Sequence, residues 1–152
     1  MTAKLTGVRE RYMRWLRTEG LLLATPLAAI AVAQLTMGAQ ARPELPTGLH
    51  TMLLALAVGS VAFGRALKRR PSEAGGEHAP EEAMTLIRTT SRSLLVAAIT
   101  PSVIGMVLVP MTGSAVDLYI TLGLTLLGLI MLFPRYVQWE SWYASLTAGG
   151  TA

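Results

Sequence analysis

Four long stretches without a formal charge constrain this chain more than any motif does. Charged residues are separated by runs of 22, 20, 24 and 17 uncharged residues, which lie at 20–41, 45–64, 93–116 and 118–134. Each run is rich in Leu, Ala, Val and Gly and is close to the roughly 20 residues that a helix needs to cross about 30 Å of hydrocarbon. One such run could be a buried soluble helix, but four in 152 residues leave too little polar surface to keep the protein in water.

We therefore expect an all-α integral membrane protein, a multi-pass four-helix bundle. The expected spans lie near Gly20–Met37, Thr47–Gly64, Ser93–Met111 and Val116–Phe133. The composition agrees, because charged residues make up only 14% of the chain, against about 25% in ordinary soluble domains. That balance excludes a disordered chain and a soluble enzyme of usual composition. The absence of Cys excludes disulfides, thiolate catalysis and thiolate metal sites.

The basic residues predict the orientation of the spans. Twelve of the 13 lie before the first span, in and beside the middle loop, or after the last span, and only Arg42 lies in a connection on the other side. Because Lys and Arg are enriched on the cytoplasmic side, we expect both termini and the middle loop in the cytoplasm, with a bacterial inner membrane as the location. The basic residues flank spans and match no RNA- or DNA-binding motif, so we expect lipid and protein contacts and no nucleic acid.

A secretory signal is the alternative interpretation of the first span. A basic start, an apolar run and Ala39-Gln40-Ala41 resemble such a signal with its cleavage site. The uncharged run is longer than the 7–15 residues of a typical signal core, and Pro26 lies inside it. We therefore expect the segment to stay as a membrane span.

An offset of 75 residues aligns the two halves of the chain without a gap. Thr25-Pro26 matches Thr100-Pro101 and Gly38 matches Gly113, and further glycines and leucines fall at the same offset. This pattern predicts two helical hairpins that are parallel copies, related by an axis roughly normal to the membrane. In each copy a Thr-Pro would kink the first span, and a Gly would mark its outer end with a positive φ.

Charged or aromatic helices are expected to flank the hairpins. The first 19 residues predict a basic amphipathic helix at the headgroup boundary, and Pro80-Glu81-Glu82 predicts the start of a second lead-in helix. After Pro134, a short interfacial helix should run to about Leu146. The expected division is a first hairpin with its lead-in at 1–68, a flexible linker at 69–79, a second hairpin with its lead-in and interfacial helices at 80–146, and a tail at 147–152.

The order of these features resembles that of the SPW-repeat membrane proteins. The shared features are a span with Thr-Pro, a Gly turn, a returning Gly-Leu span and the Trp139-x-x-Trp142 stretch. In that family the first span carries Ser-Pro-Trp, whereas this chain has Thr25-Pro26-Leu27 and Thr100-Pro101-Ser102. The resemblance implies tandem two-helix units over about residues 17–142, and it implies no reaction.

The spans lack the residues that coupled transport or catalysis would need. No charged residue lies in the central part of any span, and Gln34 is the polar residue that the first span offers. His50 could ligate haem only with a symmetry mate in a dimer and is more typical of an interfacial residue. No metal-ligand cluster, catalytic triad or phosphate loop is present, so we expect no enzyme activity, no cofactor and no metal.

Small residues and aromatic residues are the remaining signals. Stripes of small residues with prolines predict close helix packing and kinks, within the bundle or against another subunit. The residues expected in this role are Thr25, Pro26, Thr100, Pro101, Gly59, Gly64, Gly105 and Gly128. The aromatic residues gather at the cytoplasmic interface and are expected to anchor there as an aromatic belt. They are Tyr12, Trp15, Tyr136, Trp139, Trp142 and Tyr143.

These features favour a non-catalytic accessory or assembly subunit of a larger membrane protein complex. The alternative is a small passive channel or uncoupled carrier, formed at the interface of the repeats or of several copies. Thr25 and Thr100, at matching places in proline-broken spans, are the residues that favour this alternative.

Overall fold

The computed structural model describes residues 2–36, 45–73 and 78–148, and every regular element in them is helical. The elements in order are α1 (Thr2–Glu19), a 3-10 segment η1 (Gly20–Ala24), α2 (Thr25–Thr36), α3 (Thr47–Leu67), α4 (Arg70–Glu73), α5 (Pro80–Thr112), α6 (Ala115–Leu132) and α7 (Tyr136–Thr147). Four helices are long and apolar enough to cross a membrane, at Gly7–Thr36, Thr47–Leu67, Pro80–Thr112 and Ala115–Leu132. The expected all-α class and the four apolar helices are therefore confirmed.

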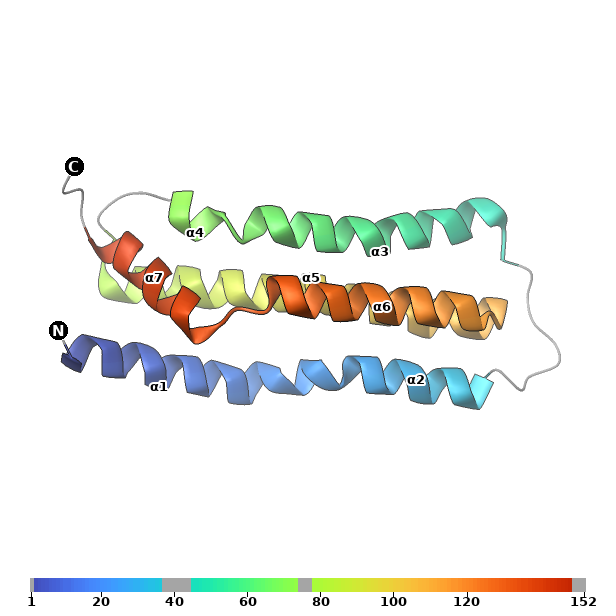
Figure 1. Cartoon of the computed structure of the whole chain (residues 1–152), viewed down its shortest axis with the longest axis horizontal. Coiled ribbons are helices and arrows are strands. Elements are labelled where there is room, and N and C mark those ends of the chain that lie inside the picture. The colour runs from blue at the N-terminus through green and yellow to red at the C-terminus, as the bar shows by residue number, and fades with distance from the viewer. Residues whose placement is uncertain (1, 37–44, 74–77, 149–152) are drawn as a thin grey trace.

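The four long helices run antiparallel to their neighbours along the chain and form an elongated bundle (Figure 1). α5 and α6 lie in the middle, while α2 and α3 lie on opposite sides of that pair. Helix α5 packs against α2, α3 and α6, whereas α2 and α3 make no extended contact with each other. The most buried helix is therefore α5, whose inward face carries the main core residues, among them Ile87, Leu94, Ala98 and Leu108.

The two ends of the bundle differ in character. We call one end the basic end, where α1 begins, α3 finishes and α7 lies, and the other the loop end, where α2 finishes and α6 begins (Figure 1). The charged residues of α1, of 65–73 and of 80–92 gather at the basic end. The loop end carries His50 and Asp117, and residues 37–44 of its first connection, including Gly38, fall outside the described residues.

Local sequence signals explain where α5 and α6 begin and end. α5 starts at Pro80, whose ring favours the first helical turn, and Glu81 and Glu82 follow at the positive end of the helix dipole. It ends at Gly113, which has a φ of 63° and donates its N–H to the carbonyl of Val109 at 2.7 Å. The hydroxyl of Ser114 then caps α6 by accepting the N–H of Asp117. The positive φ expected at Gly113 is therefore present.

Three expectations about the flanking segments differ from the structure. α1 continues in line with η1 and α2 (Figure 1), so it is not set off from the first apolar segment as a separate lead-in helix. The second lead-in and the third span are one helix of 33 residues. Charged residues interrupt an apolar run in the sequence, but they do not interrupt the helix. Within the expected linker, Arg70–Glu73 form a helical turn that contacts α7, and the N–H of His78 bonds the carbonyl of Leu146 at 3.0 Å.

Candidate functional site

The helices extend past the apolar segments at the basic end and pack there into a separate layer. We call this layer the head: it consists of α1, residues 80–92 of α5, and α7. The helix α7 follows the turn at Pro134 and contacts α1, α4 and α5. The side chain of Gln138 starts α7 by accepting the N–H of Arg135 at 3.2 Å. A helix is thus present after Pro134, and it packs against α1, while its location at a membrane interface stays a prediction.

An aromatic cluster joins α1 to α7 inside the head. The ring centroids of Tyr12 and Trp139 are 5.3 Å apart with an edge-on geometry, and those of Trp15 and Trp139 are 5.6 Å apart. Trp15 and Trp139 are each 1% exposed, and Trp142 is 4% exposed. The three tryptophans therefore pack inside the protein, which differs from the expectation that they anchor at the lipid interface. Tyr136 and Tyr143 are half-buried beside the cluster.

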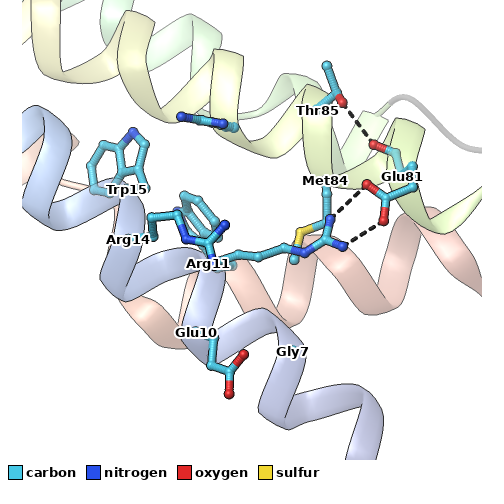
Figure 2. Close-up of a pocket in the computed structure, with 10 residues that line it drawn as sticks. Gly7, Glu10, Arg11, Arg14, Trp15, Glu81, Met84 and Thr85 are labelled. Atoms are coloured by element: carbon cyan, nitrogen blue, oxygen red, sulfur yellow. Dashed lines mark hydrogen bonds and ion pairs between the residues drawn. The ribbon is translucent and has the colours of Figure 1, made fainter.

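A cleft of about 570 Å³ opens in the head between α1 and α5 (Figure 2). Arg11 reaches across it from α1 and donates two hydrogen bonds to the Glu81 carboxylate, at 2.6 and 2.9 Å. This hydrogen bonding and the positive charge of Arg11 hold the pKa of Glu81, which lies before the apolar part of α5, below its usual value. Because both side chains are well exposed to solvent, the pair orients the two helices more than it stabilises them.

The same cleft carries two further cations. Arg14 from α1 and Arg88 from α5 line it, and in the described part of the chain neither forms an ion pair. Trp15 and Trp139 also line the cleft, but their indole N–H groups are buried and have no hydrogen-bond partner among the described residues. Carboxylate oxygens of an incoming segment are the groups that guanidinium donors bind most strongly.

A buried polar cluster ties three helices at the loop end. The Asp117 side chain, 6% exposed, lies 3.1 Å from Nε2 of His50 on α3 and accepts the Thr112 hydroxyl of α5 at 2.8 Å. The sequence pattern alone indicates only that His50 is an interfacial residue, and it does not indicate a pair with Asp117. The signal that they pair was their position at the same end of two spans, where an unpaired polar group is costly. With its partners supplied by the protein, this cluster is a structural clasp.

Small and hydroxyl residues line the contact between α5 and α6, and we call this contact the polar seam. The hydroxyls of Ser102 and Thr125 are 2.7 Å apart, and both residues are buried. A Cβ on Gly105 would overlap the Thr121 side chain, and a Cβ on Gly128 would lie 3.1 Å from the Ala98 backbone. The glycines are therefore required by close approach of the two helices. The seam is packed without room for a solute.

The remaining residues singled out in the sequence lie in different surroundings. Gly64 packs against Leu132 and Ala97, whereas an added Cβ on Gly59 would meet nothing within 4 Å. The structure thus brings Gly64, but not Gly59, into a helix contact. Lys68, just after α3, donates to the Met131 carbonyl at 2.6 Å and so fastens α3 to the end of α6. Sequence reasoning did not find this contact.

The two Thr-Pro pairs also differ locally. Pro26 lies in the first turn of α2, directly after the 3-10 segment, whereas Pro101 lies inside the continuous helix α5. The Thr25 hydroxyl donates to the Leu22 carbonyl at 2.5 Å, and the Thr25 N–H donates to the same carbonyl, so this oxygen keeps a backbone donor although Pro26 has no N–H. The Thr100 hydroxyl donates to the Val96 carbonyl at 2.8 Å, one residue before the carbonyl that Pro101 leaves without its donor.

No known protein family, curated protein or solved structure matches this chain.

Proposed function

We propose that this protein is an accessory subunit of a larger membrane complex and docks a partner through its head. The observation that carries the proposal is the cleft between α1 and α5. It is bounded by elements that the aromatic cluster and the Arg11–Glu81 pair hold in place, and it presents Arg14 and Arg88, which form no ion pair with the described residues. A segment that carries carboxylates fits these donors, because charge-assisted hydrogen bonds to guanidinium groups are the strong ones.

The proposal includes an orientation in which the basic end, and with it the head, faces the cytoplasm. Twelve of the 13 basic residues support this orientation. Because the chain has no Cys, single cysteines can test it directly with an impermeant maleimide. We expect labelling of Gly48→Cys at the loop end of α3 in intact cells, and labelling of Ser145→Cys on α7 only after permeabilisation. The reverse pattern would place the head outside.

Docking is tested by photo-crosslinking from within the cleft. A photoreactive residue in place of exposed Thr85, which lines the cleft, should give one protein adduct. The matched position is Tyr119 on α6, which is 70% exposed at the other end of the molecule and should not give that adduct. Reversal of both cleft charges, Arg14→Glu with Arg88→Glu, should abolish the adduct and separate the partner, identified by mass spectrometry, from the purified subunit.

Two outcomes would contradict the docking proposal. One is the same set of adducts from positions 85 and 119, which would indicate collisions and not a site. The other is an adduct that survives the double charge reversal while the protein stays folded.

A further inference from the structure

The surface between α3 and α5 is hollowed into a groove of about 720 Å³ near the basic end. Leu56, Gly59 and Phe63 of α3 line one side, and Val96 and Ala97 of α5 line the other. An added Cβ on Gly59 would meet nothing within 4 Å. This glycine therefore widens the groove instead of serving a contact between helices.

The hydroxyl groups in the groove do not make its interior polar. Ser60 donates to the carbonyl of Ala57 at 2.8 Å, and Thr100 donates to the carbonyl of Val96 at 2.8 Å, so their hydrogen atoms are directed to their own helices. The groove thus presents mostly hydrocarbon, with the Ser93 hydroxyl next to Arg92 as a further polar group in its lining. From Leu56 to Leu67 it follows 11 residues of helix, or roughly 16 Å, which is close to half of the ~30 Å hydrocarbon core of a bilayer.

Positive charge gathers where the groove reaches the basic end. Arg70 of α4 and Arg92 of α5 both line the groove, and both are exposed. Nε of Arg92 lies 3.6 Å from the Glu19 carboxylate, which holds one edge of that guanidinium. Arg70 forms no ion pair within the described residues. Two guanidinium groups from different elements at the end of an apolar groove are suited to a phosphate group.

We propose that this groove binds an anionic phospholipid, with its phosphate between Arg70 and Arg92 and one acyl chain along Gly59 and Phe63. A ligand with a negative head and a hydrocarbon tail is the one that matches both the charges and the apolar length of the groove. The site goes beyond the proposed docking role, because it lies on the side of the bundle between α3 and α5 and does not include the cleft in the head.

The test uses fluorescence quenching at the groove in the full-length protein. Phe63→Trp places an indole in the groove, and phosphatidylglycerol or phosphatidylcholine with brominated chains quenches it on contact. Its signal is the difference from the parent protein, which has three native tryptophans. Leu126→Trp, at a position of α6 that is 61% exposed, reports ordinary lipid contact as a matched control. We expect phosphatidylglycerol to be preferred by about tenfold at position 63 and to show no preference at position 126, because each basic residue near the membrane surface adds about 1 kcal/mol and Glu19 offsets part of this.

Further variants test whether the preference for phosphatidylglycerol arises from the groove. Arg70→Gln with Arg92→Gln should bring the preference at position 63 down to that at position 126, whereas Arg17→Gln, an exposed arginine on α1, should leave it unchanged. Gly59→Leu should reduce quenching by both lipids without lowering the thermal midpoint in detergent, since its side chain fills open space.

Three results would overturn the proposal. The first is an equal preference for phosphatidylglycerol at positions 63 and 126 when the arginines and Gly59 are unchanged. The second is an equal loss from Arg17→Gln, which would show a general effect of charge. The third is a Gly59→Leu variant that keeps its quenching but loses a co-purified membrane protein, which would assign the groove to a partner helix.

Discussion

The second pair of spans and the first pair play different parts in this bundle. α5 and α6 approach closely from the Gly105–Thr121 contact to the Gly128–Ala98 contact, and their hydroxyls bond across the seam. α2 and α3 lie on either side of that pair, and they leave large apolar residues exposed, such as Leu27 at 69% and Phe63 at 60%, as the outer face of α6 also does. In lipid there is no hydrophobic force between helices, so small and hydroxyl residues decide which pair forms the centre. The sequence pattern that the two halves share does not indicate which pair of helices is central and which is peripheral.

The largest expected effect is steric and lies at the centre of the pair. Gly128→Leu should force α6 away from the Ala98 backbone and destabilise the protein by about 3 kcal/mol, since overpacking a close contact cannot be relieved by moving a side chain. Gly123→Leu, on the same helix, has nothing within 4 Å of its added Cβ and should be nearly neutral. Unfolding in detergent, followed by circular dichroism, compares the two. Equal losses would show that α6 tolerates no added bulk anywhere.

The next effect concerns the clasp that ties α3 to the central pair. His50→Ala leaves the nearly buried Asp117 with Thr112 alone and should cost about 2 kcal/mol. In a double-mutant cycle with Asp117→Asn, most of this cost should appear as coupling between the two residues. Thr51→Ala, one residue further along α3 and bonded only to its own helix, is the control and should cost little. Additive losses in the cycle would mean that α3 is held by apolar contact alone.

The seam hydroxyls should contribute less than the clasp. Ser102→Ala and Thr125→Val remove a hydrogen bond between α5 and α6, and a double-mutant cycle should give a coupling of about 0.6 kcal/mol, the usual size for such bonds in membrane proteins. Ser60→Ala on α3 removes a hydroxyl that bonds only its own backbone and should change the unfolding free energy very little. A seam coupling near zero would assign the central contact to the glycines alone.

The spans could be predicted from the sequence because length and the absence of charge are properties of a single segment. α3, expected at Thr47–Gly64, runs from Thr47 to Leu67, and the start signal at Pro80 is where α5 begins. Packing between segments could not be predicted in this way. Nothing in the sequence states that α5 and α6 lie between α2 and α3, because all four runs are similarly apolar.

The head was missed for a related reason. An aromatic belt at the membrane surface and an aromatic cluster between helices give the same sequence signal, which is Trp and Tyr beside the ends of spans. The difference is made by α7, which folds back after Pro134 so that Trp139 meets Trp15. The cleft is lined by both of these tryptophans and by Arg14 and Arg88, which form no ion pair with the described residues. Contacts between residues so far apart in the chain leave no local pattern to recognise.

The smallest expected effect tests whether the two halves are copies, which stays a prediction. If they are, Thr25→Ala and Thr100→Ala should lower stability equally. The local structure predicts an unequal result, because the Thr25 hydroxyl reinforces the junction between η1 and α2, where it shares the Leu22 carbonyl with its own N–H. The Thr100 hydroxyl instead bonds the Val96 carbonyl inside the continuous helix α5. We expect a loss of about 0.5–1 kcal/mol for Thr25→Ala and less for Thr100→Ala. Replacing each Thr by Ser, which keeps the hydroxyl, should restore stability at position 25, and denaturant titration of the four variants measures the difference. Equal losses of stability at positions 25 and 100 would instead support two equivalent Thr-Pro kinks, as expected for copies.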